Sequence, residues 1–139
     1  MKLELQATPE EVMRAVETLQ QFCLQEGISE KTIFGLALAL EECGSNVVHH
    51  ALQGDQTKTF SVKFEHIGNT FVIELRDRGP EFDPTAAPER LPAEEDDERE
   101  PGGWGIQLVR RYIDDIGYRR EAGENVLRLT KRLKLANEQ

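Results

Sequence analysis

Three short clusters of residues could carry chemistry in this 139-residue sequence. Glu42 and Asn46 lie within an apolar run, and Asp77-Arg78-Gly79 follows a β-like run. Gly102-Gly103-Trp104-Gly105 opens a second helix-like apolar run. In chain order, the clusters offer a carboxylate with an amide oxygen, a carboxylate on a tight turn, and backbone N–H groups where phosphates can lie. Together they predict a nucleotide site.

The first cluster has helical spacing. Glu42 and Asn46 are four residues apart, so in a helix they lie about 40° apart on one face, whereas Glu41 lies about 140° from Asn46. Asn supplies a neutral oxygen ligand to Mg²⁺, and a carboxylate such as Glu42 can deprotonate a hydroxyl or water. The alternative is an amphipathic helix that shows both residues to solvent. His49 and His50 continue the same helix and can reach a phosphate or a base, although structural histidines are commoner.

The second cluster places a carboxylate directly after a buried strand. Asp77 can accept a hydrogen bond from an exocyclic amine such as adenine N6. Gly79 leaves room for a flat ring. The plain alternative is an Asp-rich turn that ends a strand, which is common.

The third cluster is the strongest single signal. Gly103 and Gly105 alternate before a helix, so free N–H groups can approach phosphate oxygens with help from the helix dipole. A Walker P-loop is excluded because no Gly-Lys-Ser/Thr follows. A dinucleotide fingerprint is excluded because Leu108 occupies the place of its third glycine. A plain junction between a loop and a helix stays open, and Trp104 and Tyr112 can be ordinary packing residues.

The elements that must position these clusters follow from caps and periodicity. Thr8-Pro9 and a capping-box Glu11 predict a helix over residues 10–26 that Gly27 stops, and Ser29 caps a second helix that ends near Gly54. A third helix is expected from about residue 103 to 113, with Gly117 as its stop. Strands are expected at 2–6, 58–66, 70–76, 117–121 and 125–135. Because the strands cluster in hairpins, we expect an α+β two-layer sandwich with a mixed, mostly antiparallel sheet and about three helices on one face.

Composition bounds the partners. The length fits one domain over residues 1–139, and the formal charge of −9 disfavours direct nucleic-acid binding. Residues 85–101 hold seven carboxylates against two arginines, together with three prolines, so residues 85–102 are expected to form a flexible acidic lid. Cys23 and Cys43 lack metal-ligand spacing and are expected to be buried thiols. No apolar run approaches the roughly 18 residues of a membrane span, so we expect a cytoplasmic protein.

The three clusters resemble a known set of sequence boxes. Residues 42–46, 77–84 and 102–106 are similar to the N, G1 and G2 boxes of the gyrase and histidine-kinase ATPase superfamily, whose domain has the Bergerat fold. Within it, the short format, the lead-in at residues 39–42 and the tail at 108–110 most resemble bacterial anti-sigma regulatory factors that are serine-protein kinases.

The resemblance implies ATP and Mg²⁺ as cofactors. Glu42 would be the general base and Asn46 the Mg²⁺ ligand, while residues 85–102 would form the ATP lid, which offers Arg90 and Arg99 to the γ-phosphate. The nucleotide-binding set that it implies is Asn46, His50, Asp77, Gly79, Phe82, Gly103, Trp104, Gly105 and Ile106. Gly44 departs from the pattern and costs the helix about 1 kcal/mol relative to alanine, which either permits close packing or does nothing more.

Two functions from different classes fit these residues. The first is a protein serine/threonine kinase that phosphorylates an anti-anti-sigma (STAS-like) partner and in another state binds a sigma factor. The second is an ATP-binding regulatory module without kinase activity. A detached histidine-kinase domain would need a phosphoacceptor elsewhere, because residues 10–26 contain no histidine. That first helix is a candidate surface for a partner or for a homodimer.

Overall fold

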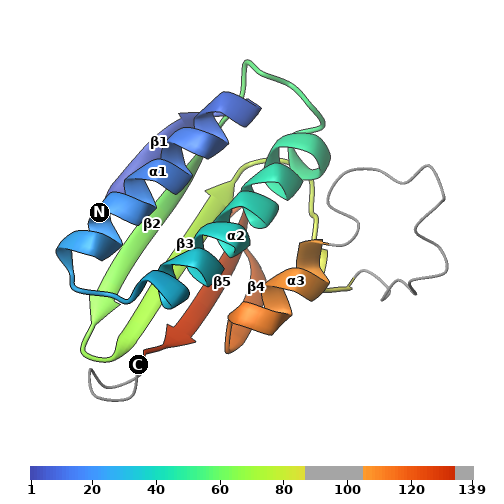
Figure 1. The fold of residues 1–139 in the computed structure, drawn as a ribbon. Coiled ribbons are helices and arrows are strands. Elements are labelled where there is room, and N and C mark those ends of the chain that lie inside the picture. Colours follow the sequence, from blue (N-terminus) through green and yellow to red (C-terminus); the bar gives the residue numbers. More distant parts are fainter. Residues whose placement is uncertain (87–104, 134–139) are drawn as a thin grey trace, which may run out of the picture.

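One antiparallel sheet and a layer of helices make up the part of the chain that the computed structural model describes, residues 1–86 and 105–133. The elements are β1 (Lys2–Gln6), α1 (Pro9–Gln25), α2 (Glu30–Asn46), the π-helical turn η1 (Val47–Ala51), β2 (Thr59–Ile67), β3 (Thr70–Asp77), the 3-10 turn η2 (Pro84–Ala86), α3 (Gly105–Tyr112), β4 (Asp115–Glu121) and β5 (Glu124–Arg132). The strand order is β1-β2-β3-β5-β4, and each of these pairs is antiparallel. α1, α2 and α3 cover one face of the sheet (Figure 1). The expected α+β sandwich is confirmed.

Side chains along each strand alternate between a helix-facing side and an open side of the sheet, and Val72 and Val126 on the open side are buried as well. In β3, Phe71, Ile73 and Leu75 are buried, while Glu74 and Arg76 on the open side form an ion pair of 2.9 Å. The same period places Asp77, the last residue of β3, in the helix-facing row. Its cross-strand partner is Asn125 near the start of β5. The apolar row therefore ends in a buried polar pair.

The helix starts follow the cap residues. Thr8 Oγ1 accepts the backbone N–H of Glu11 at 3.1 Å, and Ser29 Oγ accepts that of Thr32 at 3.3 Å. These bonds satisfy donors that have no partner within the helix. The Glu11 carboxylate accepts from the N–H of Gln6 at the end of β1, and the N–H of Thr8 donates to Gln6 O, so only the Thr8 half of the expected capping box forms.

The end of the second helix differs from the prediction. The expected α-helix continues towards Gly54, but the α-helical pattern stops at Asn46 and η1 follows it as a π-helical turn. The bond from Leu52 N to Val47 O, 2.8 Å, spans five residues instead of four. The apolar pattern of this segment fits either kind of turn, because its buried residues are Val47, Val48 and Ala51. Such π-helical turns are rare and occur frequently at functional sites.

The third helix is shorter than predicted. It ends at Tyr112, and Gly117 lies inside β4 instead of stopping the helix. The backbone N–H of Ile113 still reaches Val109 O, but the N–H of Asp114 bonds to Thr130 O of β5. Pairing with the sheet therefore takes over from the helix at Asp114, three residues before Gly117.

Two glycines allow the helices to approach closely. A Cβ at Gly44 would lie 3.0 Å from Val12 Cγ1 of α1, so the glycine in α2 serves close packing. A Cβ at Gly35 would lie 2.8 Å from Tyr112 Cδ1 and 3.0 Å from Tyr112 Cβ of α3. The close packing of α1 and α3 against α2 thus requires residues without a Cβ in α2.

The two cysteines are free and buried, as expected. Burial raises the pKa of both thiols to about 12, with a smaller contribution from the nearby charges of Glu26 and Glu42. Neither thiol ionises near neutral pH, so both behave as small apolar residues.

Gly35→Ala is expected to lower the free energy of unfolding by about 1–2 kcal/mol, because overpacking against Tyr112 outweighs the gain in helix propensity. Urea denaturation measures this. Gly117→Ala is the matched control, since no atom lies within 4 Å of a Cβ built there, and it should stay within about 0.5 kcal/mol of the parent. Equal stability of the two variants would contradict the packing described here.

Candidate nucleotide site

A buried carboxylate and a buried amide meet where β3 ends and β5 begins. The side chains of Asp77 and Asn125 are each only 4% exposed. Asp77 Oδ1 accepts hydrogen bonds from Asn125 Nδ2 at 2.9 Å and from the backbone N–H of Gly79 at 2.8 Å. Burial raises the pKa of Asp77, and these two hydrogen bonds oppose that rise. The result is a fixed, buried acceptor.

The turn after Asp77 is pinned from two sides. Arg120 Nη1 of β4 donates to Gly79 O at 2.7 Å, and Asn125 Nδ2 donates to Pro80 O at 2.9 Å. Gly79 also lies against the carbonyl of Ala51 in η1, where any Cβ would collide with the backbone oxygen. Glycine is required here by lack of space, since this residue has no positive φ.

The π-helical turn supplies an aromatic contact to the same loop. The His50 ring lies nearly parallel to the Phe82 ring, with an interplanar angle of 15° and a centroid separation of 5.5 Å. The backbone N–H of Phe82 is held by Asn125 Oδ1 at 3.1 Å. His50 and Phe82, both predicted as nucleotide contacts, are therefore neighbours, while His49 is exposed.

The end of α2 brings the two residues of the first cluster to this region. Asn46 is only 5% exposed, and its side chain makes no hydrogen bond to any residue within 1–86 or 105–133. An unsatisfied buried amide costs about 1–3 kcal/mol, which asks for a functional explanation. Glu42, one turn earlier, is half-buried. Burial raises the pKa of Glu42, and the charge of Glu41 adds to the rise.

A small cavity lies between Asn46, Asp77 and Asn125. It measures about 20 Å³, enough for about one water molecule. Polar groups on its wall come from Asn46, Asp77, Tyr118 and Asn125, and the remaining lining residues are Cys43, Val47, Ala51, Leu75, Phe82, Pro84 and Leu127. A purine base needs more room than this, so it can occupy this cavity only if part of the wall shifts outward.

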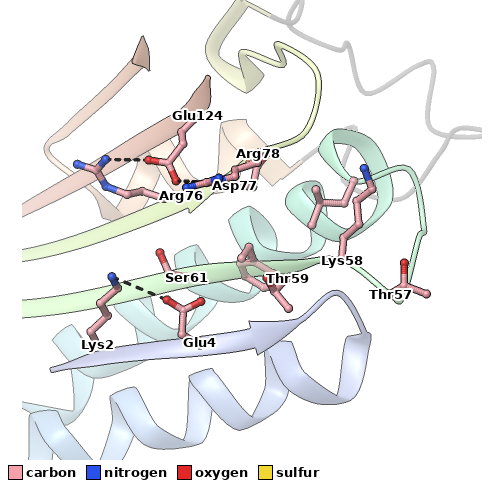
Figure 2. A pocket seen from close by; sticks show the side chains of 12 residues that line it. Lys2, Glu4, Thr57, Lys58, Thr59, Ser61, Arg76, Asp77, Arg78 and Glu124 are labelled. Carbon is pink, nitrogen blue, oxygen red and sulfur yellow. Dashed lines mark hydrogen bonds and ion pairs between the residues drawn. The ribbon is translucent and has the colours of Figure 1, made fainter. Parts of the chain in front are cut away.

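A larger cleft of about 600 Å³ lies beside this region, along β1, β2 and the end of β3 (Figure 2). It shares Asp77 with the small cavity, but its lining includes none of Glu42, Asn46 and Phe82. Ion pairs already connect its charged residues, such as Arg76 Nη1 with Glu124 at 3.3 Å and Lys2 with Glu4 at 3.8 Å. Of the predicted site residues, Asn46, Asp77 and Phe82 line the smaller cavity, whereas Glu42 lines neither space.

The third cluster lies mostly outside the described residues. Gly102, Gly103 and Trp104 belong to the undescribed stretch, as do Arg90, Arg99 and all of the acidic segment except residues 85 and 86. Gly105 is the first residue of α3, as predicted for a glycine at a helix start, and Ile106 is buried in the core. The nucleotide roles of these residues stay predictions.

Sequence reasoning missed Asn125, Tyr118 and Arg120. Asn125 follows a turn glycine and reads as part of the hairpin, because asparagine is common in turns. The available signal was its spacing: Asn125 is two residues before Leu127 and four before Leu129, so it lies on the same, helix-facing side of the strand as these buried leucines.

A model of the histidine kinase-like ATPase domain matches residues 5–131. The chain belongs to this family. The family implies ATP as the nucleotide. The matched span contains every residue of the cavity.

Similar proteins align over nearly the whole chain. Serine/threonine-protein kinase BtrW of Bordetella bronchiseptica is 29% identical over 128 residues, which cover 92% of this chain and 90% of that protein. Serine-protein kinase RsbW of Listeria innocua is 28% identical over 129 residues, which cover 90% of this chain and 82% of that protein.

Solved structures share the fold. The structure of the RsbU and RsbW domains of a Mycobacterium tuberculosis protein superposes with a TM-score of 0.69 at 18% identity, covering 96% of this chain and 31% of that longer chain. The SiaB-SiaC complex of Pseudomonas aeruginosa gives a TM-score of 0.62 at 11% identity, covering 94% of this chain and 88% of that chain. Both likenesses confirm the arrangement of sheet and helices.

Two features are absent from residues 1–86 and 105–133. No helix there is long and apolar enough to cross a membrane. No group of three or more His, Cys, Asp or Glu side chains there could hold a metal ion. A divalent cation at Asn46 would therefore need ligands beyond such a cluster, as Mg²⁺ does when it binds with phosphates and water.

The Glu42 carboxyl is expected to titrate above 4.5, and Glu41→Gln should lower that pKa without removing the part due to burial. Carboxyl NMR titration measures both effects. Since the folded pKa exceeds the unfolded one, this group reduces stability as the pH rises from 4.5 through the folded value. Glu42→Gln is thus expected to keep or raise the free energy of unfolding at pH 7. A Glu42 pKa at or below 4.5 would contradict the described burial.

Proposed function

We propose that this protein is a Mg²⁺-ATP-dependent protein serine/threonine kinase that acts as an anti-sigma regulatory factor. The observation that carries the proposal is Asn46, which is buried without a hydrogen-bond partner among residues 1–86 and 105–133, lines the same cavity as Asp77 and follows the half-buried Glu42 by one helical turn. The relatives named serine-protein kinases align over about nine-tenths of the chain, which supports the same assignment.

The residues fit Mg²⁺-ATP by their chemistry. Asp77 offers a carboxylate acceptor for the amine of adenine, and the backbone N–H of Gly79 holds that carboxylate in place. Asn46 offers a neutral oxygen of the kind that Mg²⁺ accepts beside phosphates and water. Binding the metal would also satisfy the amide oxygen that has no partner among the described residues.

Phosphoryl transfer asks little covalent chemistry of the protein. Bound Mg²⁺-ATP supplies the phosphoryl group and the charge that neutralises it. Glu42 would take the proton from the acceptor serine hydroxyl while that oxygen replaces the bridging oxygen on the γ-phosphorus, and ADP would leave with the electron pair of the broken P–O bond. A carboxylate with a raised pKa is a stronger base than an exposed one, so the burial of Glu42 suits this role.

The protein partners follow from the same assignment. We assign the acceptor serine to a STAS-like anti-anti-sigma protein. In another nucleotide state, the second partner is a sigma factor. RsbW and BtrW carry kinase names, and SiaB was solved in complex with SiaC, so related chains act on or bind proteins. The charge of −9 also favours a protein partner over nucleic acid.

Glu42→Gln is expected to lower phosphoryl transfer by about 100-fold or more while the Kd for ATP changes little, since general-base catalysis contributes about 10²–10⁴-fold. The assay follows γ-labelled ATP onto candidate anti-anti-sigma proteins encoded in the same genome, beside an ATP-binding titration. Glu41→Gln is the control, because Glu41 faces away from Asn46 and should retain transfer.

The outcomes separate the two candidate functions. Label on a partner serine that is lost with Glu42→Gln establishes the kinase and its base together. ATP binding without transfer to any candidate would favour the regulatory module that lacks kinase activity. Absence of ATP binding would exclude both functions.

Asn46→Ala is expected to abolish most of the increase in ATP affinity that Mg²⁺ gives the parent, because the variant lacks the amide oxygen. Calorimetric titrations of ATP with Mg²⁺ and with EDTA measure that ratio. Ser45→Ala, at a half-buried neighbour in α2, serves as the control and should keep the ratio. A Mg²⁺ effect that survives in Asn46→Ala would remove Asn46 as the ligand.

A further inference from the structure

Asn125 lies at the centre of the densest polar network in the described residues. Its Oδ1 accepts from Tyr118 Oη at 2.6 Å, from Phe82 N at 3.1 Å and from Arg120 Nη1 at 3.1 Å. Its Nδ2 donates to Asp77 Oδ1 and to Pro80 O, both at 2.9 Å. One amide therefore connects β3, β4, β5 and the turn after Asp77.

This network permits only one orientation of the amide. With the amide reversed, its NH₂ would face the N–H groups of Phe82 and Arg120, and its oxygen would face the carboxylate of Asp77. Both changes would break hydrogen bonds in a buried place, where each unsatisfied group costs about 1–3 kcal/mol. The N–H groups of Phe82 and Arg120 thus determine which end of Asn125 meets Asp77, and the Tyr118 hydroxyl adds a third hydrogen bond to that arrangement.

The fixed amide in turn makes the two carboxylate oxygens of Asp77 unequal. Oδ1 receives both of the carboxylate's hydrogen bonds from the described residues, and Oδ2 receives none from them. Asp77 lines the small cavity together with Asn125 and Asn46. One oxygen is consequently held as a spare acceptor for a ligand that brings a donor.

The charge on Asp77 depends on the same contact. Burial raises its pKa, the bond from Asn125 is the largest opposing effect, and smaller effects come from Gly79, Arg120 and Glu124. A carboxylate that loses the Asn125 bond is more readily protonated, and the protonated form can donate a hydrogen bond. Without Asn125, Asp77 therefore discriminates less between a ligand group that donates a hydrogen bond and one that accepts it.

We propose that Asn125 is a positioning residue that determines base specificity, by holding Asp77 as an acceptor for the 6-amino group of a purine and against a 6-oxo group. The inference rests on the nucleotide site of the proposed function. A 6-amino purine donates to the spare oxygen, whereas a 6-oxo purine presents an acceptor to an acceptor. Sites built around such a polar match reject the mismatched ligand strongly, because buried groups are left unpaired.

The test compares ATP with ITP, which carries an oxo group in place of the 6-amino group. Calorimetry gives the Kd of each triphosphate with Mg²⁺ for the parent, Asn125→Ala and Tyr118→Phe. Tyr118→Phe keeps the ring and removes only the hydroxyl that donates to Asn125, so it also serves if Asn125→Ala fails to fold. Asn69→Ala, in the exposed β2–β3 turn, is the matched control.

The parent should prefer ATP over ITP by tenfold or more. Asn125→Ala should reduce that ratio about tenfold, which corresponds to one lost hydrogen bond of about 1.4 kcal/mol, Tyr118→Phe should reduce it less, and Asn69→Ala should leave it unchanged. If the variants weaken ATP and ITP equally, Asn125 is only structural and the inference is overturned while the kinase proposal stands. If the parent binds neither triphosphate, the nucleotide site and this inference both fall.

Discussion

The hydrogen bond between Asp77 and Asn125 is the contact on which the candidate site depends. Two polar side chains stand in a row of the sheet that is otherwise apolar, and neither is exposed enough to be satisfied by bulk water. A buried carboxylate is stable only when hydrogen bonds replace its lost hydration. Asn125 and Gly79 N supply them, and the turn after β3 has to adopt the shape that makes both possible.

The end of α2 is adapted to this turn. η1 places Ala51 O against Gly79 and His50 on Phe82, so the π-helical turn and the turn after β3 fit one another. Just before η1, Asn46 is buried without a partner among the described residues, a cost that an ordinary helix end would not carry. Local strain of this kind is common where function requires a particular geometry. The polar groups of the candidate site are thereby held at the ends of regular elements that fit one another.

Most of the fold could be predicted because local rules decide it. Thr8 and Ser29 cap their helices as expected, and period-two alternation found the strands. The π-helical turn could not be predicted, since its buried residues suit an α-helix equally well. The prediction that Gly117 stops the third helix was wrong, because sheet pairing at Asp114 ends α3 earlier. Within the site, the spacing of Glu42 and Asn46 and the position of Asp77 were readable, but Asn125 depends on strand order, which local patterns do not encode.

The pairing of Asp77 with Asn125 also has a consequence for how the site is assembled during synthesis. The two residues are 48 positions apart, and β3 pairs with β5, not with the next strand along the chain. Closing so long a loop costs entropy before the contact repays it. A nascent chain that has completed α1, α2 and the β2–β3 hairpin still lacks the partner of its buried carboxylate. The buried polar pair of the candidate site therefore forms only when the last hairpin has joined the sheet.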